Sequence, residues 1–201
     1  MILYLSLIVE GHGETEAVPI LLRRMLAVLR PELSLEISTS LRIGRQRLVK
    51  DGEVERAVEF AARRMKPPRA ILILIDADDD CPAQVAPALL ARAVHARGDV
   101  PIAVVLAKRE FEAWFLAALE SLRGRRGLLP GHTPVTDPEE VRDAKGFLTR
   151  NMAGTRAYSP VVDQPALAAL FDLDLARKRS GSFDKLWRDM QRLLGTPMAD
   201  T

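Results

Sequence analysis

The sequence predicts an α/β fold with a mostly parallel, four-stranded sheet, flanked by helices and followed by a helical C-terminal extension. Apolar segments of strand length alternate with amphipathic segments of helix length through the first half of the chain. Strands that alternate with helices are joined by right-handed crossovers, which make the sheet parallel. Beyond about residue 123 helical patterns continue, but no further strand pattern follows.

The predicted strands are short runs of apolar and β-branched residues. The run at 70–75, Ala-Ile-Leu-Ile-Leu-Ile, is uninterrupted, which is typical of a strand buried on both faces of a sheet. The runs at 2–9 and 102–106 have the same character, and a weaker pattern predicts a strand near 34–42.

The predicted helices lie between these strands and are delimited by proline. The helix at about 15–30 carries leucines at helical spacing on one face, and Pro31 ends it. The amphipathic helix at 52–66 stops at Pro67-Pro68. Further helices are predicted at 83–97, from Glu110 onward, and at 138–151, 164–170 and 182–194, before frayed residues at 196–201.

We divide the chain into an α/β domain at residues 1–122 and a helical extension at 123–201 that packs on the same core. The apolar fraction of 48% is ordinary for a globular protein, and a net charge of +2 provides no global basic field. Cys81, the single cysteine, allows no intrachain disulfide, and we expect its thiol to be at least half buried. No apolar run has the length of a membrane span, so we expect a cytoplasmic protein without a membrane partner.

An acidic loop follows directly on the strand at 70–75. It carries four carboxylates within five residues, at Asp76, Asp78, Asp79 and Asp80. These groups repel one another, so their placement is costly unless a cation offsets the charge. Open α/β sheets bind their ligands at the C-terminal edge of the strands. The loop therefore predicts a divalent-metal site.

A second acidic turn follows the first strand, with the sequence Glu10-Gly11-His12-Gly13-Glu14. Its glycines permit a tight turn, and Glu10 is expected at the same sheet edge as the Asp loop. Hard oxygen ligands select Mg²⁺, Mn²⁺ or Ca²⁺ rather than zinc. We expect one shared site, with His12 as a weak candidate base and metal ligands drawn from Glu10, Glu14, Asp76, Asp78 and Asp80.

Three other motifs fail on spacing. An EF-hand loop starting at Asp76 would need Gly and Glu where the chain has Cys81 and Pro87. A haloacid-dehalogenase phosphatase usually carries Asp-x-Asp on its first strand, followed by Thr or Val, whereas here Asp80 follows. A P-loop needs Gly-Lys-Ser/Thr, and the turn after the first strand has no lysine.

Further candidate residues follow the fourth strand and lie in the extension. Glu110 or Glu112 can add a carboxylate at the same sheet edge, although a salt-bridged helix start would explain them equally well. Trp114 is expected in the core rather than as a stacking platform. The extension offers Lys145. Candidates for phosphate or nucleic-acid binding are Lys108, Arg177 and Arg179, the latter two in a basic run that is ordinarily a solvated turn.

The paired acidic motifs resemble the Toprim domain of primases, topoisomerases and several nucleases. The resemblance is carried by the Glu-Gly turn at Glu10 and the Asp-x-Asp at Asp76 and Asp78, and it covers about residues 1–110. Glu14 after this turn is similar to the overcoming-lysogenization-defect nucleases. The Asp78-Asp79-Asp80 run and the Gly13 turn depart slightly from the simplest Toprim pattern, which leaves open which carboxylates bind metal directly.

Nearly the whole chain resembles a bacterial Toprim-like family, domain of unknown function 4276. This resemblance is carried by Glu-Phe-Glu-Ala-Trp at 110–114, Asp-Ala-Lys-Gly at 143–146, Asp163-Gln164 and Ser182-Phe183. These motifs are specific to the family, but they name no activity.

The Toprim resemblance implies that Asp76 and Asp78 bind Mg²⁺ or Mn²⁺, and that Glu10 binds a second ion or acts as general acid or base. It further implies a positively charged side chain that neutralises the charge of the transition state. The candidates for this role are, in order of preference, Lys145, Arg177 and Arg179. The implied activity is metal-dependent, nuclease-type cleavage of DNA or RNA, with antiphage defence as its context.

Two alternatives stay open. The chain has no Walker motif, so it is alternatively a partner-dependent nucleic-acid-binding module that works with a separate ATPase subunit. Its near-neutral charge slightly favours this alternative, because unaided binding to nucleic acid usually needs several phosphate contacts. The other alternative is a small-molecule phosphohydrolase. The sequence also leaves open whether the substrate is DNA or RNA, which metal is bound, and whether the protein forms a homodimer.

Overall fold

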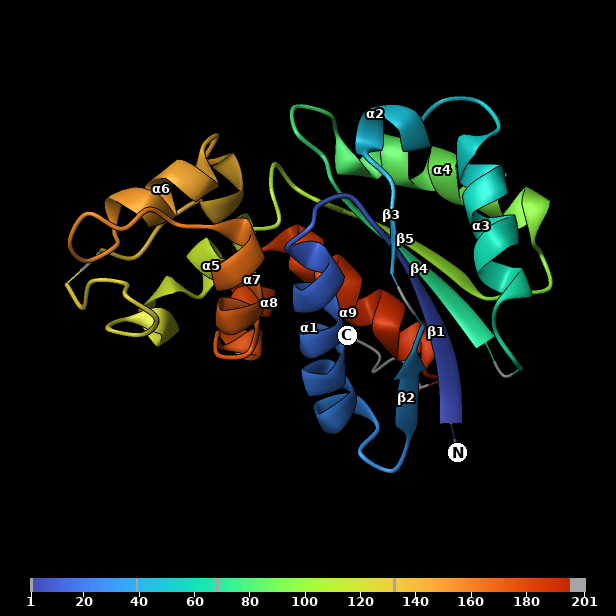
Figure 1. Ribbon diagram of the computed structural model, residues 1–201, viewed down its shortest axis with the longest axis horizontal. Helices are drawn as coiled ribbons and strands as arrows, with labels where there is room; N and C mark the ends of the chain where they lie inside the picture. Colours follow the sequence, from blue (N-terminus) through green and yellow to red (C-terminus); the bar gives the residue numbers. More distant parts are fainter. Residues whose placement is uncertain (1, 39, 68, 132, 196–201) are drawn as a thin grey trace.

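The computed structural model describes residues 2–38, 40–67, 69–131 and 133–195, and it confirms the predicted α/β fold. The sheet has the strand order β2-β1-β4-β5, with β3 as a further partner of β1, and every pair is parallel (Figure 1). Residues 196–201, which the sequence predicts to fray, lie outside the described residues. The strands are β1 (Ile2–Val9), β2 (Ser34–Ile37), β3 (Leu41–Arg42), β4 (Arg69–Asp76) and β5 (Ile102–Ala107).

The predicted strand at 34–42 is two short strands in the structure. Both pair with β1, β2 beside its beginning and β3 beside its end. Two serines flank the interruption and use their hydroxyls on the neighbouring backbone: Ser38 Oγ is 3.4 Å from the Leu5 carbonyl, and Ser40 Oγ is 3.4 Å from the Thr15 carbonyl. Such local side-chain bonds compete with the regular ladder.

The helices partly differ from their predicted bounds. The helix expected at 138–151 is divided, because Asp143 caps a new helix by accepting a 2.8 Å hydrogen bond from Gly146 N–H. The short helices α2 and α8 were not predicted. The α-helices are α1 (Glu14–Leu29), α2 (Arg45–Leu48), α3 (Glu53–Arg63), α4 (Pro82–Ala96), α5 (Ala113–Ala117), α6 (Ala144–Arg150), α7 (Pro160–Ala168), α8 (Leu173–Arg179) and α9 (Gly181–Leu193), with 3₁₀ turns at Leu119–Leu122 and Pro138–Glu140.

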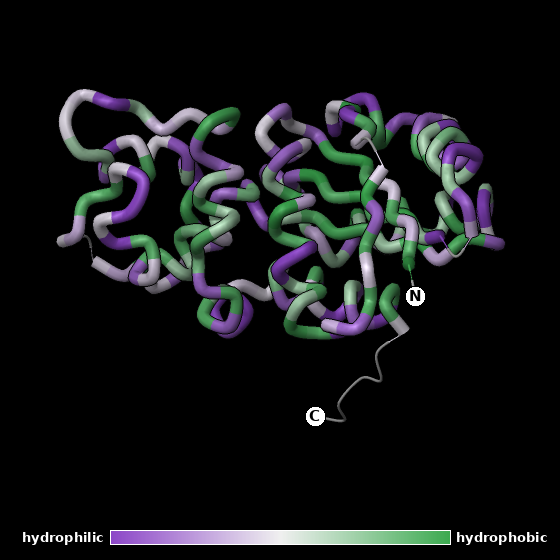
Figure 2. The backbone as a smooth tube through the Cα atoms, turned by 60° about the horizontal axis from the view of Figure 1, so that its bottom comes forward, coloured by the Kyte–Doolittle hydropathy of each residue, from purple (hydrophilic) through white to green (hydrophobic). Residues whose placement is uncertain are grey.

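The sheet separates two apolar layers. Ile71, Ile73 and Ile75 of β4 face the layer that contains α3 and α4, whereas Leu72 and Leu74 face the layer that contains α1 and α9 (Figure 1). In Figure 2 these strands are strongly hydrophobic stretches of the backbone in the interior. Burial on both faces explains why the sequence of β4 is an unbroken apolar run.

The helices after residue 123 share their core with the sheet. Phe171, Phe183 and Trp187 belong to the same apolar cluster as Leu72 and Leu74, on the face of β4 that is covered by α1 and α9. Trp114 is fully buried, with its ring 5.3 Å from that of Phe183, so the prediction that it belongs to the core is confirmed. Within the described residues, no helix is both long enough and apolar enough to cross a membrane.

Candidate functional site

The predicted acidic strand ends meet at one edge of the sheet. β1 pairs in parallel with β4, with Val9 opposite Leu74, so Glu10 and Asp76 both leave the sheet at its C-terminal edge. β5 pairs in turn with β4, with Ala107 opposite Asp76, and the segment containing Glu110 and Glu112 follows from it. Parallel pairing alone accounts for this meeting of three loops.

Glu14 is the most buried carboxylate of the first turn. Its side chain folds back so that Oε2 accepts hydrogen bonds from the Glu10 and Gly11 N–H groups, at 3.0 and 3.2 Å. Only 4% of Glu14 is exposed. Burial raises the pKa of Glu14 to about 7. The negative charges of Glu112 and Glu10 also raise this pKa, whereas the two backbone hydrogen bonds lower it.

Asp76 ends β4 and faces the same cluster. Its Oδ1 accepts a 2.7 Å hydrogen bond from Phe111 N–H, and its Oδ2 lies 3.9 Å from Lys145 Nζ. Burial raises the pKa of Asp76 well above its ordinary value, and the repulsion from Glu14 and Glu112 raises it further. The three carboxylates thus act on one another, although they come from three separate segments.

Lys145 is the cation of this cluster. Its Nζ is 2.9 Å from Glu110 Oε2 and 3.1 Å from Glu112 Oε2. Burial opposes its charge, but the Glu112 and Asp76 carboxylates outweigh burial and raise the pKa of Lys145 above its ordinary value. Lys145 is therefore positively charged at physiological pH and offsets part of the negative charge around it.

Glu112 is fully buried and held from two further directions. Its Oε1 accepts a 3.0 Å hydrogen bond from the Tyr158 hydroxyl and a 3.3 Å bond from Gln164 Nε2. Burial raises the pKa of Glu112, while Lys145 works in the opposite direction. The bonds fix the Glu112 carboxylate in one orientation toward Lys145.

The rest of the Asp loop leaves this cluster. Asp78 has a φ of 50°, and its N–H donates to the Arg109 carbonyl at 3.0 Å, so the chain turns outward directly after Asp76 and Ala77. Asp78 and Asp80 pair with the Arg45 guanidinium. The side chains of both are more than half exposed, at 62% and 56%. The structure therefore places Asp78 and Asp80 beside arginine rather than beside Glu10 and Asp76.

Three arginines surround this loop, and the sequence pattern did not single them out. Arg45 also donates its backbone N–H to Glu10 Oε1 at 3.2 Å, which connects the loop to the cluster. Arg109 and Arg142 both pair with Asp79. Only their positions in the sequence could have indicated these arginines: Arg45 follows a Gly after β3, and Arg109 follows β5, so both lie at the C-terminal edge of the sheet.

The predicted phosphate-binding residues are engaged elsewhere. Arg177 pairs with Asp184 at 2.8 Å and lies over the Trp187 ring. Arg179 pairs with Glu120 at 2.5 Å. Lys108 pairs with Glu140, beside the Asp loop but outside the carboxylate cluster. His12 is exposed in the first turn. Cys81 is exposed as well, so the expectation that its thiol is at least half buried was wrong.

The donor chemistry of the cluster suits a hard cation. Glu10 Oε2 is buried and has no hydrogen-bond partner, and, after burial, the negative charge of Glu14 raises the pKa of Asp76 further. A divalent ion would satisfy the free oxygen and relieve this repulsion. As the side chains stand, however, no group of three or more His, Cys, Asp or Glu residues in the described part of the chain is arranged to hold a metal ion.

Four sequence motifs that lie far apart in the chain meet around Glu112 and the neighbouring helix α9. Glu110 and Glu112 contact Lys145, and Gln164 contacts Glu112. Ser182 Oγ accepts a 2.9 Å hydrogen bond from Trp114 Nε1. These contacts give the segments at 110–114, 143–146, 163–164 and 182–183 a common structural role.

Comparison with known proteins identifies a family without an assigned activity. The family model described as "Domain of unknown function (DUF4276)" matches residues 9–191, which includes every residue of the carboxylate cluster. Neither the curated proteins nor the solved structures contain a match to the chain.

Proposed function

This chain belongs to the DUF4276 family, and we propose that it is a Mg²⁺- or Mn²⁺-dependent enzyme that cleaves phosphodiester bonds in nucleic acid. The observation that carries the proposal is the cluster of half-buried Glu10, buried Glu14 and half-buried Asp76 at the C-terminal ends of two adjacent parallel strands, with Lys145 beside it. The adjacency of these strands also supports the Toprim relationship that the motifs suggest.

Glu10, Glu14 and Asp76 are the residues that would hold the metal. Glu10 contributes a buried oxygen without a hydrogen-bond partner. Asp76 contributes its Oδ2, which lies 3.9 Å from Lys145 Nζ. A bound ion would supply a nucleophile by lowering the pKa of a water molecule and would stabilise charge on the phosphate. Glu14 must lose its proton to join, so metal binding is expected to strengthen as the pH rises through about 7.

The basic residues at this edge would act on the phosphate. Lys145 keeps its positive charge because of its carboxylate neighbours, and its side chain is 42% exposed, so it can contact a substrate oxygen. Arg45 and Arg109 reach the same edge, and their present partners are exposed aspartates that a phosphate can replace. In this proposal Arg177 and Arg179 take no part, because they pair elsewhere.

The experiment is cleavage of labelled single- and double-stranded DNA and RNA by the purified chain with Mn²⁺ or Mg²⁺. Asp76→Asn and Glu10→Gln are expected to lower the rate about 100-fold or more, because each removes a ligand charge. Asp174→Asn, at an exposed position on α8, is the matched control and should keep full activity. Unchanged cleavage by either site variant would exclude the proposed mechanism.

A second candidate function is a nucleic-acid-binding module that needs a partner such as a separate ATPase. The observation that favours it is Lys145, which already offsets the negative charge of Glu110 and Glu112 without a metal. In this case the chain alone binds oligonucleotide without cleaving it, and Mg²⁺ does not raise its melting temperature. A small-molecule phosphohydrolase, by contrast, would act on its substrate with little dependence on salt.

A further inference from the structure

Three arginines from separate segments meet beside the acidic loop that follows β4. They are Arg45 at the start of α2, Arg109 after β5 and Arg142 before α6. Each of them pairs with an aspartate of this loop: Arg45 with Asp78 and Asp80, and both Arg109 and Arg142 with Asp79. Three guanidinium groups therefore face three carboxylates, at the edge of the sheet where the carboxylate cluster lies.

The two sides of these ion pairs differ in their exposure. The side chain of Asp79 is 74% exposed, whereas those of Arg45 and Arg109 are only 13% and 18% exposed. Solvated ion pairs contribute little to stability, so the aspartates can leave their partners without unfolding the protein. Arg45 is also held through its backbone, because its N–H donates to Glu10 Oε1 at 3.2 Å. The arginines are thus the fixed part of this contact, and the aspartates are the replaceable part.

The aspartates leave part of the donor capacity of the arginines unused. Within the described chain, the Nε atoms of Arg45 and Arg109 are buried and have no hydrogen-bond partner. Asp78 meets Arg45 only at Nη1, and the distance is 3.4 Å. A guanidinium group binds best to an anion that accepts through two oxygens at once. A phosphate group has more acceptor oxygens than a carboxylate, so it would supply acceptors that the loop does not.

A small polar cavity of about 130 Å³ is lined by Arg109 and Arg142. Asp79 and Glu110 also line it, so it lies between the acidic loop and a residue that holds Lys145. Its volume exceeds what one water molecule needs and leaves room for a phosphate group. A phosphate in this cavity would contact both arginines from the position that Asp79 takes in the free protein.

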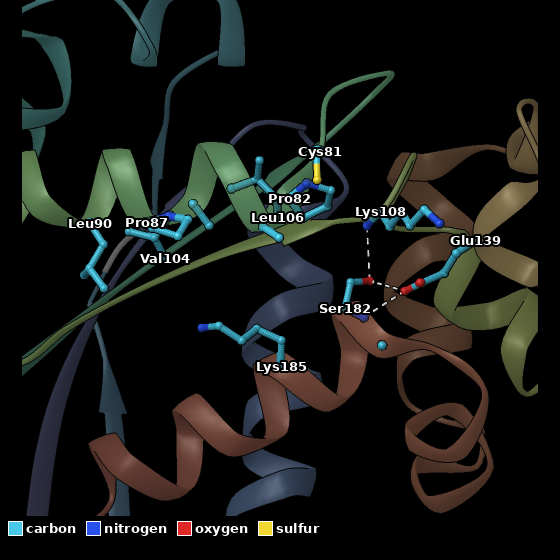
Figure 3. A pocket seen from close by; sticks show the side chains of 13 residues that line it. Cys81, Pro82, Pro87, Leu90, Val104, Leu106, Lys108, Glu139, Ser182 and Lys185 are labelled. Atoms are coloured by element: carbon cyan, nitrogen blue, oxygen red, sulfur yellow. Dashed lines mark hydrogen bonds between the residues drawn. The ribbon is translucent and has the colours of Figure 1, made fainter.

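Another cavity, of about 480 Å³, is less suited to a phosphate group. Figure 3 shows apolar side chains such as Leu90 and Leu106 along its wall, and Lys108 and Lys185 extend in opposite directions. These lysines do not converge on one anion, as the two arginines do at Asp79. Recognition of phosphate beside the carboxylate cluster is therefore best served by the arginines.

We propose that the aspartates at 78–80 are an internal mimic of the substrate, which occupies a phosphate-binding site made of Arg45, Arg109 and Arg142. When nucleic acid binds, a phosphate other than the one that is cleaved displaces these aspartates. The loop thereby lowers the affinity of the free protein for nucleic acid. This inference rests on the proposed function for the class of ligand, and it assigns the three aspartates to autoinhibition rather than to metal binding.

The test measures binding of fluorescently labelled single- and double-stranded DNA and RNA by anisotropy in EDTA, at low salt. Asp79→Asn should tighten binding at least about 3-fold, and Asp78→Asn/Asp79→Asn/Asp80→Asn at least about 10-fold, because each substitution frees an arginine. Asp174→Asn removes the same charge from an exposed position on α8 and should change the affinity by less than about 1.5-fold. Unchanged or weaker binding by the loop variants, or no binding by any of these proteins, would overturn the proposal.

A second comparison separates the proposed contact from a general effect of charge. In a protein that carries Arg109→Gln and Arg142→Gln, Asp79 has lost both of its arginine partners. Asp79→Asn should then give less than half of the gain that it gives in the natural sequence. An equal gain in both backgrounds would mean that Asp79 acts only through long-range electrostatics, and the proposal would fail.

The failure of this inference and the failure of the proposed function can be told apart. Because binding is measured without metal, a nuclease whose loop variants bind no more tightly would refute only the internal mimic. A protein that cleaves nothing, but whose loop variants bind nucleic acid more tightly, would refute only the proposed cleavage.

Discussion

At the scale of single residues, the buried carboxylates determine how the site responds to pH. Glu14 has a pKa of about 7 in the folded protein, against an ordinary value of 4.5. Below pH 4.5 both the folded and the unfolded state hold this proton. As the pH rises toward 7 only the folded state keeps it, so the free energy of unfolding falls.

Glu14→Gln should therefore stabilise the protein at high pH. Above pH 7 the expected gain is about 3 kcal/mol, and it should disappear below pH 4.5, because Gln keeps the acceptor for Glu10 and Gly11 N–H but carries no charge. Urea denaturation at pH 8 and pH 4 measures the difference. An equal effect at both pH values would show that Glu14 is not the group that titrates.

Lys145 should stabilise the fold through Glu112. Lys145→Gln leaves the buried Glu112 carboxylate without its cation, and we expect the free energy of unfolding to fall by about 2 kcal/mol, since Lys145 is partly exposed. A double-mutant cycle with Glu112→Gln should reveal coupling above about 1 kcal/mol. Additive effects of the two substitutions would contradict a direct interaction.

At the scale of elements, the turn between β1 and α1 depends on close packing against α7. A Cβ atom at Gly13 would lie 2.2 Å from Gln164 Oε1 and 2.4 Å from the Pro160 carbonyl oxygen. Gln164 in turn donates to Glu112, so the Gly13 turn positions Glu14 and supports the Glu112 network at once. The glycine is required here for close approach and not for its backbone angles.

Gly13→Ala should lower the free energy of unfolding by about 2 kcal/mol, because the Pro160 backbone cannot easily move aside. It should also impair any metal-dependent activity, since Glu10 and Glu14 flank the turn. Gly131→Ala is the control, because a Cβ there meets nothing within 4 Å. Denaturant unfolding compares the two variants, and equal stabilities would refute the packing argument.

At the scale of the whole molecule, the helical region after residue 123 completes both the core and the site. Phe171, Phe183 and Trp187 pack in the cluster that contains the inner face of the sheet. The same region contributes Lys145, Tyr158 and Gln164 to the surroundings of Glu112. The α/β half alone therefore keeps α1 on this face of its sheet but lacks the rest of the apolar cover.

A chain shortened to residues 1–122 is consequently expected not to fold. It should show no cooperative thermal transition by circular dichroism, and its ¹H–¹⁵N spectrum should lack dispersion, whereas the full chain should show both. A cooperative, dispersed fragment would mean that the extension is a separable domain.

The sequence by itself determined the α/β class, the main strands along the chain and the placement of Glu10 and Asp76 at the same edge of the sheet. These follow from local patterns, because an unbroken apolar run such as 70–75 must be buried on both faces, and parallel strands bring their ends to one edge. The family motifs also pointed to Lys145 and Glu112 as residues of interest.

Only the tertiary structure decided which carboxylates lie close together. Asp78 and Asp80 follow Asp76 closely in sequence, but a left-handed backbone at Asp78 sends them to Arg45 instead. Glu112 meets Tyr158 and Gln164 across 46 and 52 residues, a contact that no local pattern encodes. Long-range contacts of this kind depend on how the helices pack, so local sequence patterns do not reveal them.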